Sequence, residues 1–278
     1  MNAAQAEFSF FILRGSSSVL FYPTAMLAHW QLHQHTASLA DARFQAALRW
    51  SRPSDGLVDV KLADTPLTEC RFLGIDIPPT ESTAVPTSSD CYVRGAEIVV
   101  AYRATTGWPV QTDAVWRALT PTTSNGWIAA IELIVSVRTA LLDSRPALSV
   151  QNSLAVQETW RLVDPAGPHF EAVGLSQSRP PLAWENGPGC LLFRLRPSDL
   201  SYAEMVHPAD FCHDALANEP EQPFRVRATH CLFSNALEKG VILRGRVRGI
   251  FLPRGNDMAV AAAAYAQFAA EDPPLGTY

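Results

Sequence analysis

Residues 44–62 read FQAALRWSRPSDGLVDVKL and show the alternation that dominates the sequence. Apolar and polar residues alternate over 44–51, and the alternation resumes over 58–62 after a turn at 54–56. This period of two is typical of half-buried β-strands, and a Ser-Asp-Gly turn between two such runs predicts a β-hairpin with a loop longer than two residues. A helix over 36–47 competes at the start of the stretch, because that segment is rich in alanine.

The same alternation recurs along most of the chain. Strands are predicted at 8–13, 19–22, 96–104, 110–120, 126–142, 158–164, 189–196, 224–233 and 241–253. The turn at 14–18 joins the first two, and the loop at 234–240 is long enough for a hairpin turn between the last two. Loops rich in Pro, Ser and Thr separate many of the strands. Many strands with regular turn signals favour a sandwich or barrel over βαβ units.

One helix is predicted, over 259–270, with Asn256 or Asp257 as its cap and Asp272-Pro273 after its end. We expect it to cover a sheet edge or a barrel end. Residues 201–217 are ambiguous, because Ser201 and Glu204 match a capping box but Pro208 breaks a continuous helix. Two short helical turns are predicted there.

These patterns predict an all-β or β-dominated fold, a large antiparallel β-sandwich (supersandwich-like) with a C-terminal α-helix. Residues 1–278 are expected to form a single large β-rich domain. The alternative is two β lobes, 1–145 and 146–278, which meet near 144–151.

Composition and absent motifs limit the function. The chain has 278 residues, 18% of them charged, and a formal net charge of −5, without a basic run that would favour a nucleic-acid partner. No apolar run reaches the length of a membrane span, and residues 1–7 lack the basic region of a signal peptide. Five widely spaced cysteines without a Cys-x-x-Cys pair suit a reducing cytoplasm. Without a nucleotide-binding glycine motif, a nucleophile elbow or His-Glu-x-x-His, no cofactor or metal is predicted.

Arginine occupies alternate positions of three predicted strands in the C-terminal half. The residues are Arg194 and Arg196, Arg225 and Arg227, and Arg244, Arg246 and Arg248. Side chains two apart on a strand point to the same face. If the strands are neighbours, one face carries up to seven guanidiniums, which would attract carboxylates, sulfates or phosphates. Alternatively, these arginines face solvent and nearby Glu or Asp residues neutralise them.

Titratable residues cluster after the first arginine strand. Glu204 and His207 lie near each other in the chain, and His230 follows on a later strand, so the three are candidates for an acid and a base. The alternatives are a polar loop with helix caps at 204–213 and a hydrogen-bonded core position for His230. Trp184 is a candidate to stack on a sugar ring or, equally, to plug the end of a sandwich.

In size and strand content the chain resembles large β-sandwich sugar-binding enzymes such as aldose epimerases and related lyases, although their paired His and Glu signatures are not found. The first hypothesis is a binding or accessory protein for a carbohydrate or anionic ligand, through Arg194, Arg227, Arg244, Arg246, Arg248 and Trp184. The second is a sugar-acting enzyme, epimerase-like or lyase-like, that uses Glu204, His207 and His230. The third is a structural or interaction protein without a small-molecule site. The oligomeric state is not set by the sequence.

Overall fold

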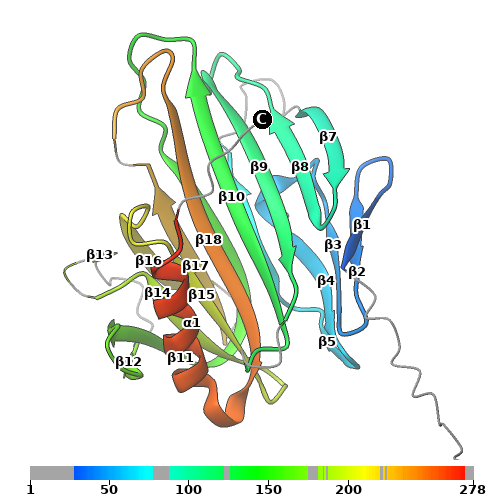
Figure 1. Cartoon of the computed structure of the whole chain (residues 1–278), viewed down its shortest axis with the longest axis vertical. Helices are drawn as coiled ribbons and strands as arrows, with labels where there is room; N and C mark the ends of the chain where they lie inside the picture. Colours follow the sequence, from blue (N-terminus) through cyan, green and yellow to red (C-terminus); the bar gives the residue numbers. More distant parts are fainter. Residues whose placement is uncertain are drawn as a thin grey trace, which may run out of the picture.

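The structure is a computed structural model that describes residues 28–77, 88–121, 126–174, 181–183, 185, 187–219, 222, 224–233 and 235–272. The strands predicted at 8–13 and 19–22 lie outside these residues, as does Trp184. Eighteen β-strands and one α-helix are present in the described part of the chain (Figure 1). All the strand pairings are antiparallel, so the predicted fold class is confirmed.

The strands form two facing sheets. The order in the first sheet is β7 (Ser88–Arg94), β8 (Glu97–Tyr102), β9 (Val110–Leu119), β10 (Ala129–Thr139), β18 (Ile242–Pro253), β15 (Leu200–Val206), β14 (Cys190–Leu195), β11 (Leu148–Asp164) and β12 (His169–Ala172). The order in the second sheet is β1 (His29–Leu32), β2 (Ala37–Ala40), β3 (Phe44–Leu48), β4 (Leu57–Leu62), β6 (Arg71–Asp76), β11 again, β17 (Arg225–Leu232), β16 (His213–Asn218) and β13 (Leu182–Ala183), and β5 (Thr65–Leu67) pairs with β4.

Strand β11 belongs to both sheets. Its first half, Leu148 to Ala155, pairs with β6 and β17 of the second sheet. Its second half, from Val156 onward, pairs with β14 and β12 of the first sheet. This one strand therefore joins the two sheets of the sandwich.

The core lies between the sheets and is rich in aromatic rings. Phe72 of β6 packs against Tyr202 of β15 and Phe251 of β18, with ring centroids 4.8 and 5.0 Å apart. Phe44 of β3 contacts Phe251 at 5.5 Å. These contacts come from both sheets, as expected where alternate side chains of two sheets face each other.

The helix α1 (Asp257–Ala269) packs on the outer face of the first sheet, over β14, β15 and β18 (Figure 1). Ala261, Tyr265 and Phe268 lie in a second apolar cluster there with Leu192 and Met205. The helix therefore covers a sheet face, and the expectation of a sheet edge or barrel end is wrong. The reason is that β14 and β15 carry apolar residues on both of their faces.

Several predicted elements are confirmed. The hairpin of residues 44–62 is present as β3 and β4, and the segment 36–47 forms strands rather than the competing helix.

Residues 201–217 form β15 and β16, so the prediction of two short helical turns is wrong. Their capping-box match is accidental, since the Ser201 hydroxyl donates a hydrogen bond to Asp257 and Glu204 lies in the core.

The hairpin predicted between 224–233 and 241–253 is also wrong. Strand β17 pairs with β11 and β16 of the second sheet, whereas β18 pairs with β10 and β15 of the first. The intervening segment therefore crosses between the sheets.

No described helix is long and apolar enough to cross a membrane.

Candidate functional site

The structure separates the arginines that alternate in sequence. Because β17 and β18 belong to different sheets, Arg227 lies on the outer face of the second sheet and Arg246 on the outer face of the first. Arg194 lies at the start of α1, where its Nε donates to Asp257 Oδ2 at 2.9 Å. Arg244 donates from Nε to Ser136 Oγ at 3.0 Å on β10. The seven guanidiniums thus do not share one face.

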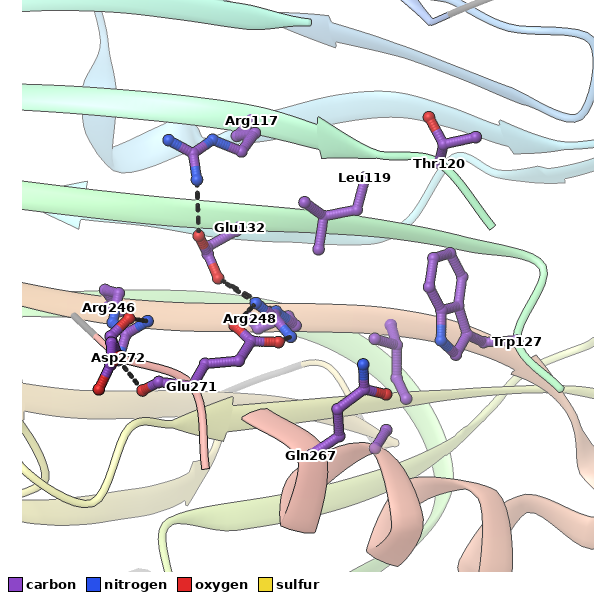
Figure 2. Close-up of a pocket in the computed structure, with 12 residues that line it drawn as sticks. Arg117, Leu119, Thr120, Trp127, Glu132, Arg246, Arg248, Gln267, Glu271 and Asp272 are labelled. Carbon is purple, nitrogen blue, oxygen red and sulfur yellow. Dashed lines mark hydrogen bonds and ion pairs between the residues drawn. The ribbon is translucent and has the colours of Figure 1, made fainter. Parts of the chain in front are cut away.

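Two of these arginines line a cleft beside the helix. The cleft has a volume of about 430 Å³ and lies between α1 and the outer face of β9, β10 and β18 (Figure 2). Its polar and charged lining residues are Arg117, Thr120, Trp127, Glu132, Arg246, Arg248, Gln267, Glu271 and Asp272. Helix α1 stands on the sheet over β14, β15 and β18. The cleft therefore lies between one side of the helix and the outer face of the neighbouring strands.

A chain of ion pairs crosses the floor of the cleft. Arg117 contacts Glu97 at 2.6 Å and Glu132 at 3.4 Å. Glu132 also contacts Arg248 at 2.5 Å, and Arg248 contacts Glu271 at 2.6 Å (Figure 2). The antiparallel register creates this chain, because Arg117, Glu132 and Arg248 are directly paired across β9, β10 and β18. Both guanidiniums in this row of ion pairs, those of Arg117 and Arg248, already have carboxylate partners.

Arg246 holds the end of the helix. Its guanidinium donates to the main-chain oxygens of Glu271 and Asp272 at 3.4 and 3.3 Å, and the residue is 2% exposed. These oxygens follow the last turn of α1, where carbonyl groups lack helical partners. The Nε atom of Arg246 is buried and has no partner among the described residues.

The other end of the cleft is less charged. Figure 2 shows Trp127 and Gln267 there, away from the ion pairs, with Leu119 and Thr120 nearby. Trp127 is half-buried, and it packs partly against the cluster beneath α1. A flat indole beside amide and hydroxyl groups provides an apolar surface with hydrogen-bonding groups at its edge.

The candidate acid–base residues occupy two separate places. His207 follows β15 on the outer side of the sheet, where its ring meets Phe268 of α1 edge-on at 5.5 Å. Burial and the nearby charge of Arg246 lower the pKa of His207. Glu204 and His230 lie in the core on the opposite side of the same sheet, both fully buried. The structure therefore brings Glu204 and His230 together and leaves His207 apart from them.

His230 stands between two carboxylates in the core. Its Nε2 lies 2.5 Å from Glu204 Oε1, and its Nδ1 contacts Asp214 Oδ1 of the neighbouring strand β16. Burial lowers the pKa of His230, but the charges of Asp214 and Glu204 outweigh this effect and raise it to about 10. The ring is therefore an imidazolium at neutral pH.

Two further side chains complete this interior cluster. The Tyr202 hydroxyl donates to Glu204 Oε2 at 2.5 Å, and Asn152 Nδ2 donates to Glu204 Oε1 at 2.7 Å. Glu204 is thus satisfied on both oxygens, whereas Asp214 Oδ2 is buried without a partner among the described residues. Within the same residues, no group of three His, Cys, Asp or Glu side chains could hold a metal ion.

Sequence reasoning missed Asp214 as a partner of His230 and missed Arg117, Trp127, Glu132 and Glu271 as cleft residues. The sequence offered one signal for a cleft residue: Glu132 alternates with apolar residues on its predicted strand, which places it on the opposite face from them. Its partners come from strand pairings and a helix contact, which alternation within a single segment does not specify.

No family model matches the chain, and no curated protein matches it in sequence. Among solved structures, a candidate aldose 1-epimerase from Escherichia coli K12 is 9% identical, with 81% of this chain and 99% of that one covered and a TM-score of 0.48. A candidate kojibiose phosphorylase from human microbiome is 10% identical, with 89% and 33% covered and a TM-score of 0.42. A heparinase III gene product is 8% identical, with 82% and 36% covered and a TM-score of 0.35. At these identities and TM-scores, no activity is inferred from the likeness.

Proposed function

We propose that the cleft beside α1 binds a neutral, hydroxyl-rich ligand, and that the protein is a carbohydrate-binding module. The observation that carries this proposal is the composition of the lining. Three arginines are matched by three acidic residues, Glu132, Glu271 and Asp272, and Trp127 lies at the less charged end. Donors, acceptors and an aromatic face are the groups that a sugar ring with its hydroxyls requires.

The ion pairs favour a neutral ligand over an acidic one. An anion that approached Arg248 or Arg117 would compete with Glu132, whose side chain is 2% exposed. Leaving that carboxylate buried and unpaired carries a large desolvation cost. A hydroxyl group, in contrast, donates to the carboxylates and accepts from the guanidiniums without disturbing the pairs.

The same pairs favour binding over acid–base catalysis in the cleft. A general acid needs a carboxyl group with a raised pKa. Burial raises the pKa of Glu271, but the ion pair with Arg248 outweighs it and holds the pKa below its usual value. The alternative, a sugar-acting enzyme that uses Glu204, His207 and His230, stays a prediction. Two of these residues are fully buried and separated from His207 by a sheet.

Isothermal titration calorimetry with neutral mono- and oligosaccharides, and with glucuronate as the acidic probe, tests the proposal. We expect saturable binding of a neutral sugar and an affinity loss of about tenfold or more in Trp127→Ala, because stacking contributes about 1 kcal/mol beyond the buried area. Trp160→Ala is the matched control, since Trp160 is also half-buried but contacts Arg194 away from the cleft. Binding of glucuronate alone, or an equal loss in both variants, would contradict the proposal.

A further inference from the structure

Two arginines of the second sheet stand on either side of one serine. Strand β11 lies between β6 and β17, and Ser153 is the register partner of both Arg71 and Arg227. Directly paired side chains have Cβ atoms about 4.5–5.5 Å from each other, and they point to the same face. Both arginines are exposed, so this Arg–Ser–Arg row lies on the outer face of the sheet.

A β-bulge sets this register. Between the pairs Gln151–Gly74 and Ser153–Arg71, β6 contains one residue more than β11, and Leu73 adopts a φ of +53°. The Leu73 main-chain N–H donates to Asn152 Oδ1 at 2.8 Å, and its carbonyl accepts from Trp116 Nε1 at 3.0 Å. Without the bulge, Arg71 would not be opposite Ser153. Bulges often re-aim a side chain in this way beside functional sites.

The row lines a small polar cavity with an excess of positive charge. The cavity has a volume of about 190 Å³, and its charged lining residues are Arg71, Arg225, Arg227 and Glu219. Among the described residues, three cations and one anion leave this cavity a formal excess of two positive charges, whereas the charges that line the cleft beside α1 balance. Gln151 and Ser153 add an amide and a hydroxyl group.

The carboxylates around this cavity leave the arginines incompletely neutralised. Arg71 pairs with Asp55 at 2.9 Å, outside the cavity lining. Arg227 reaches Glu219 only at 3.5 Å. Arg225 donates to the main-chain oxygen of Glu69, and no carboxylate of the described residues lies within 4.0 Å of it. Three guanidiniums that line one small cavity repel one another unless an anion joins them.

The geometry points to a binding site for a tetrahedral oxyanion, a phosphate or sulfate group, formed by Arg71, Arg225, Arg227 and the Ser153 hydroxyl. Guanidiniums bind such groups through paired, charge-assisted hydrogen bonds, and three of them match the several oxygens of a tetrahedral anion better than the two of a carboxylate. The site lies on the sheet opposite the sugar cleft and does not depend on it.

Calorimetric titrations with inorganic phosphate, inorganic sulfate and acetate at constant ionic strength test this site. Saturable binding of phosphate and sulfate, and weaker binding of acetate, is expected. Arg225→Gln and Arg227→Gln should each weaken phosphate binding about tenfold or more, since each removes charge-assisted hydrogen bonds to the anion. Arg138→Gln is the control, because Arg138 is exposed on β10 and lines neither cavity.

A gain of affinity provides the second test. Among the described residues, Glu219 is the one carboxylate that lines the cavity, so phosphate affinity should rise several-fold in Glu219→Gln. Trp127→Ala should leave it unchanged, which separates a failure of this site from a failure of the sugar cleft. Absence of saturable binding, an equal loss in Arg138→Gln, or weaker binding in Glu219→Gln would overturn the inference. Circular dichroism spectra of each variant establish that it is folded.

Discussion

The Nε2 atom of His230 lies 2.5 Å from Oε1 of Glu204, although the two residues come from different sheets of the sandwich. Strand β17 of the second sheet carries His230, and β15 of the first sheet carries Glu204. Neither side chain is exposed to solvent. With Asp214 on the other side of the ring, this contact is a charged link between sheets whose facing side chains are mostly apolar.

Loss of the central cation should destabilise the protein strongly. His230→Gln leaves Glu204 and Asp214 buried without their charged partner, and breaking a buried pair in this way costs about 3–5 kcal/mol. Urea denaturation measures the free energy of unfolding. His169→Gln is the control, because His169 is exposed on β12 and should change stability by less than about 0.5 kcal/mol. A cost below about 1 kcal/mol for His230→Gln would contradict the charged link.

Stability should fall as the pH rises from about 7 to about 8.5. The pKa of His230 is about 10 in the folded protein, above the 6.5 of a free histidine, so the stability from its charge is complete below about pH 6.5 and is lost as the pH rises toward 10. The expected slope is about −1.4 kcal/mol per pH unit. Urea titrations at several pH values measure it, and His230→Gln should abolish it. A wild-type stability that is flat over this range would show that the ring is not charged.

The interior cluster also requires a glycine on the neighbouring strand. A Cβ atom at Gly249 would lie 2.3 Å from the Tyr202 hydroxyl, the group that donates to Glu204. Gly249→Ala is therefore expected to cost about 1–3 kcal/mol, as overpacking of a core does. At Gly245 on the same strand, the nearest atom to a Cβ is Leu232 Cδ1 at 3.3 Å, so Gly245→Ala should cost less. Thermal unfolding compares the two, and equal costs would contradict this account of Gly249.

The two candidate sites should differ in their response to salt. A neutral sugar in the charge-balanced cleft gains little from long-range attraction, so its affinity should change less than about twofold between 0.05 and 0.5 M sodium chloride. Phosphate at the three arginines should bind several-fold more weakly over the same range, because salt screens exposed charges. Calorimetric titrations at each salt concentration measure both affinities. A strongly salt-dependent sugar affinity would indicate that the cleft recognises charge.

The sequence predicted the β-sandwich because alternation within single segments carries that information. Residues 44–62 fold as predicted, and β9, β10 and β14 lie within their predicted segments. Residues 201–217 were misread since Tyr202 and Ala203 are both buried, which removes the alternation. Pro208 lies in the turn after β15 and therefore breaks no helix.

The candidate sites depend on which strands are neighbours, and a single sequence does not specify this. The alternate arginines were visible, but the crossing between β17 and β18 assigns Arg227 and Arg246 to different sheets. Arg71 lies about eighty residues before Ser153 and reaches it only through the bulge in β6. Trp184, the tryptophan proposed from the sequence, lies outside the described residues, and Trp127 provides the indole of the cleft.

Nuclear magnetic resonance of the tryptophan indoles can detect directly whether Trp127 and its neighbours bind a neutral sugar. The chain contains seven tryptophans, and Trp127→Phe identifies the Trp127 signal in a protein labelled with ¹⁵N-tryptophan. During titration with a neutral oligosaccharide, we expect the Trp127 indole signal to shift saturably while that of Trp160 stays in place. A Trp127 signal that does not move for any neutral sugar that binds the protein would show that the cleft beside α1 is not the sugar site.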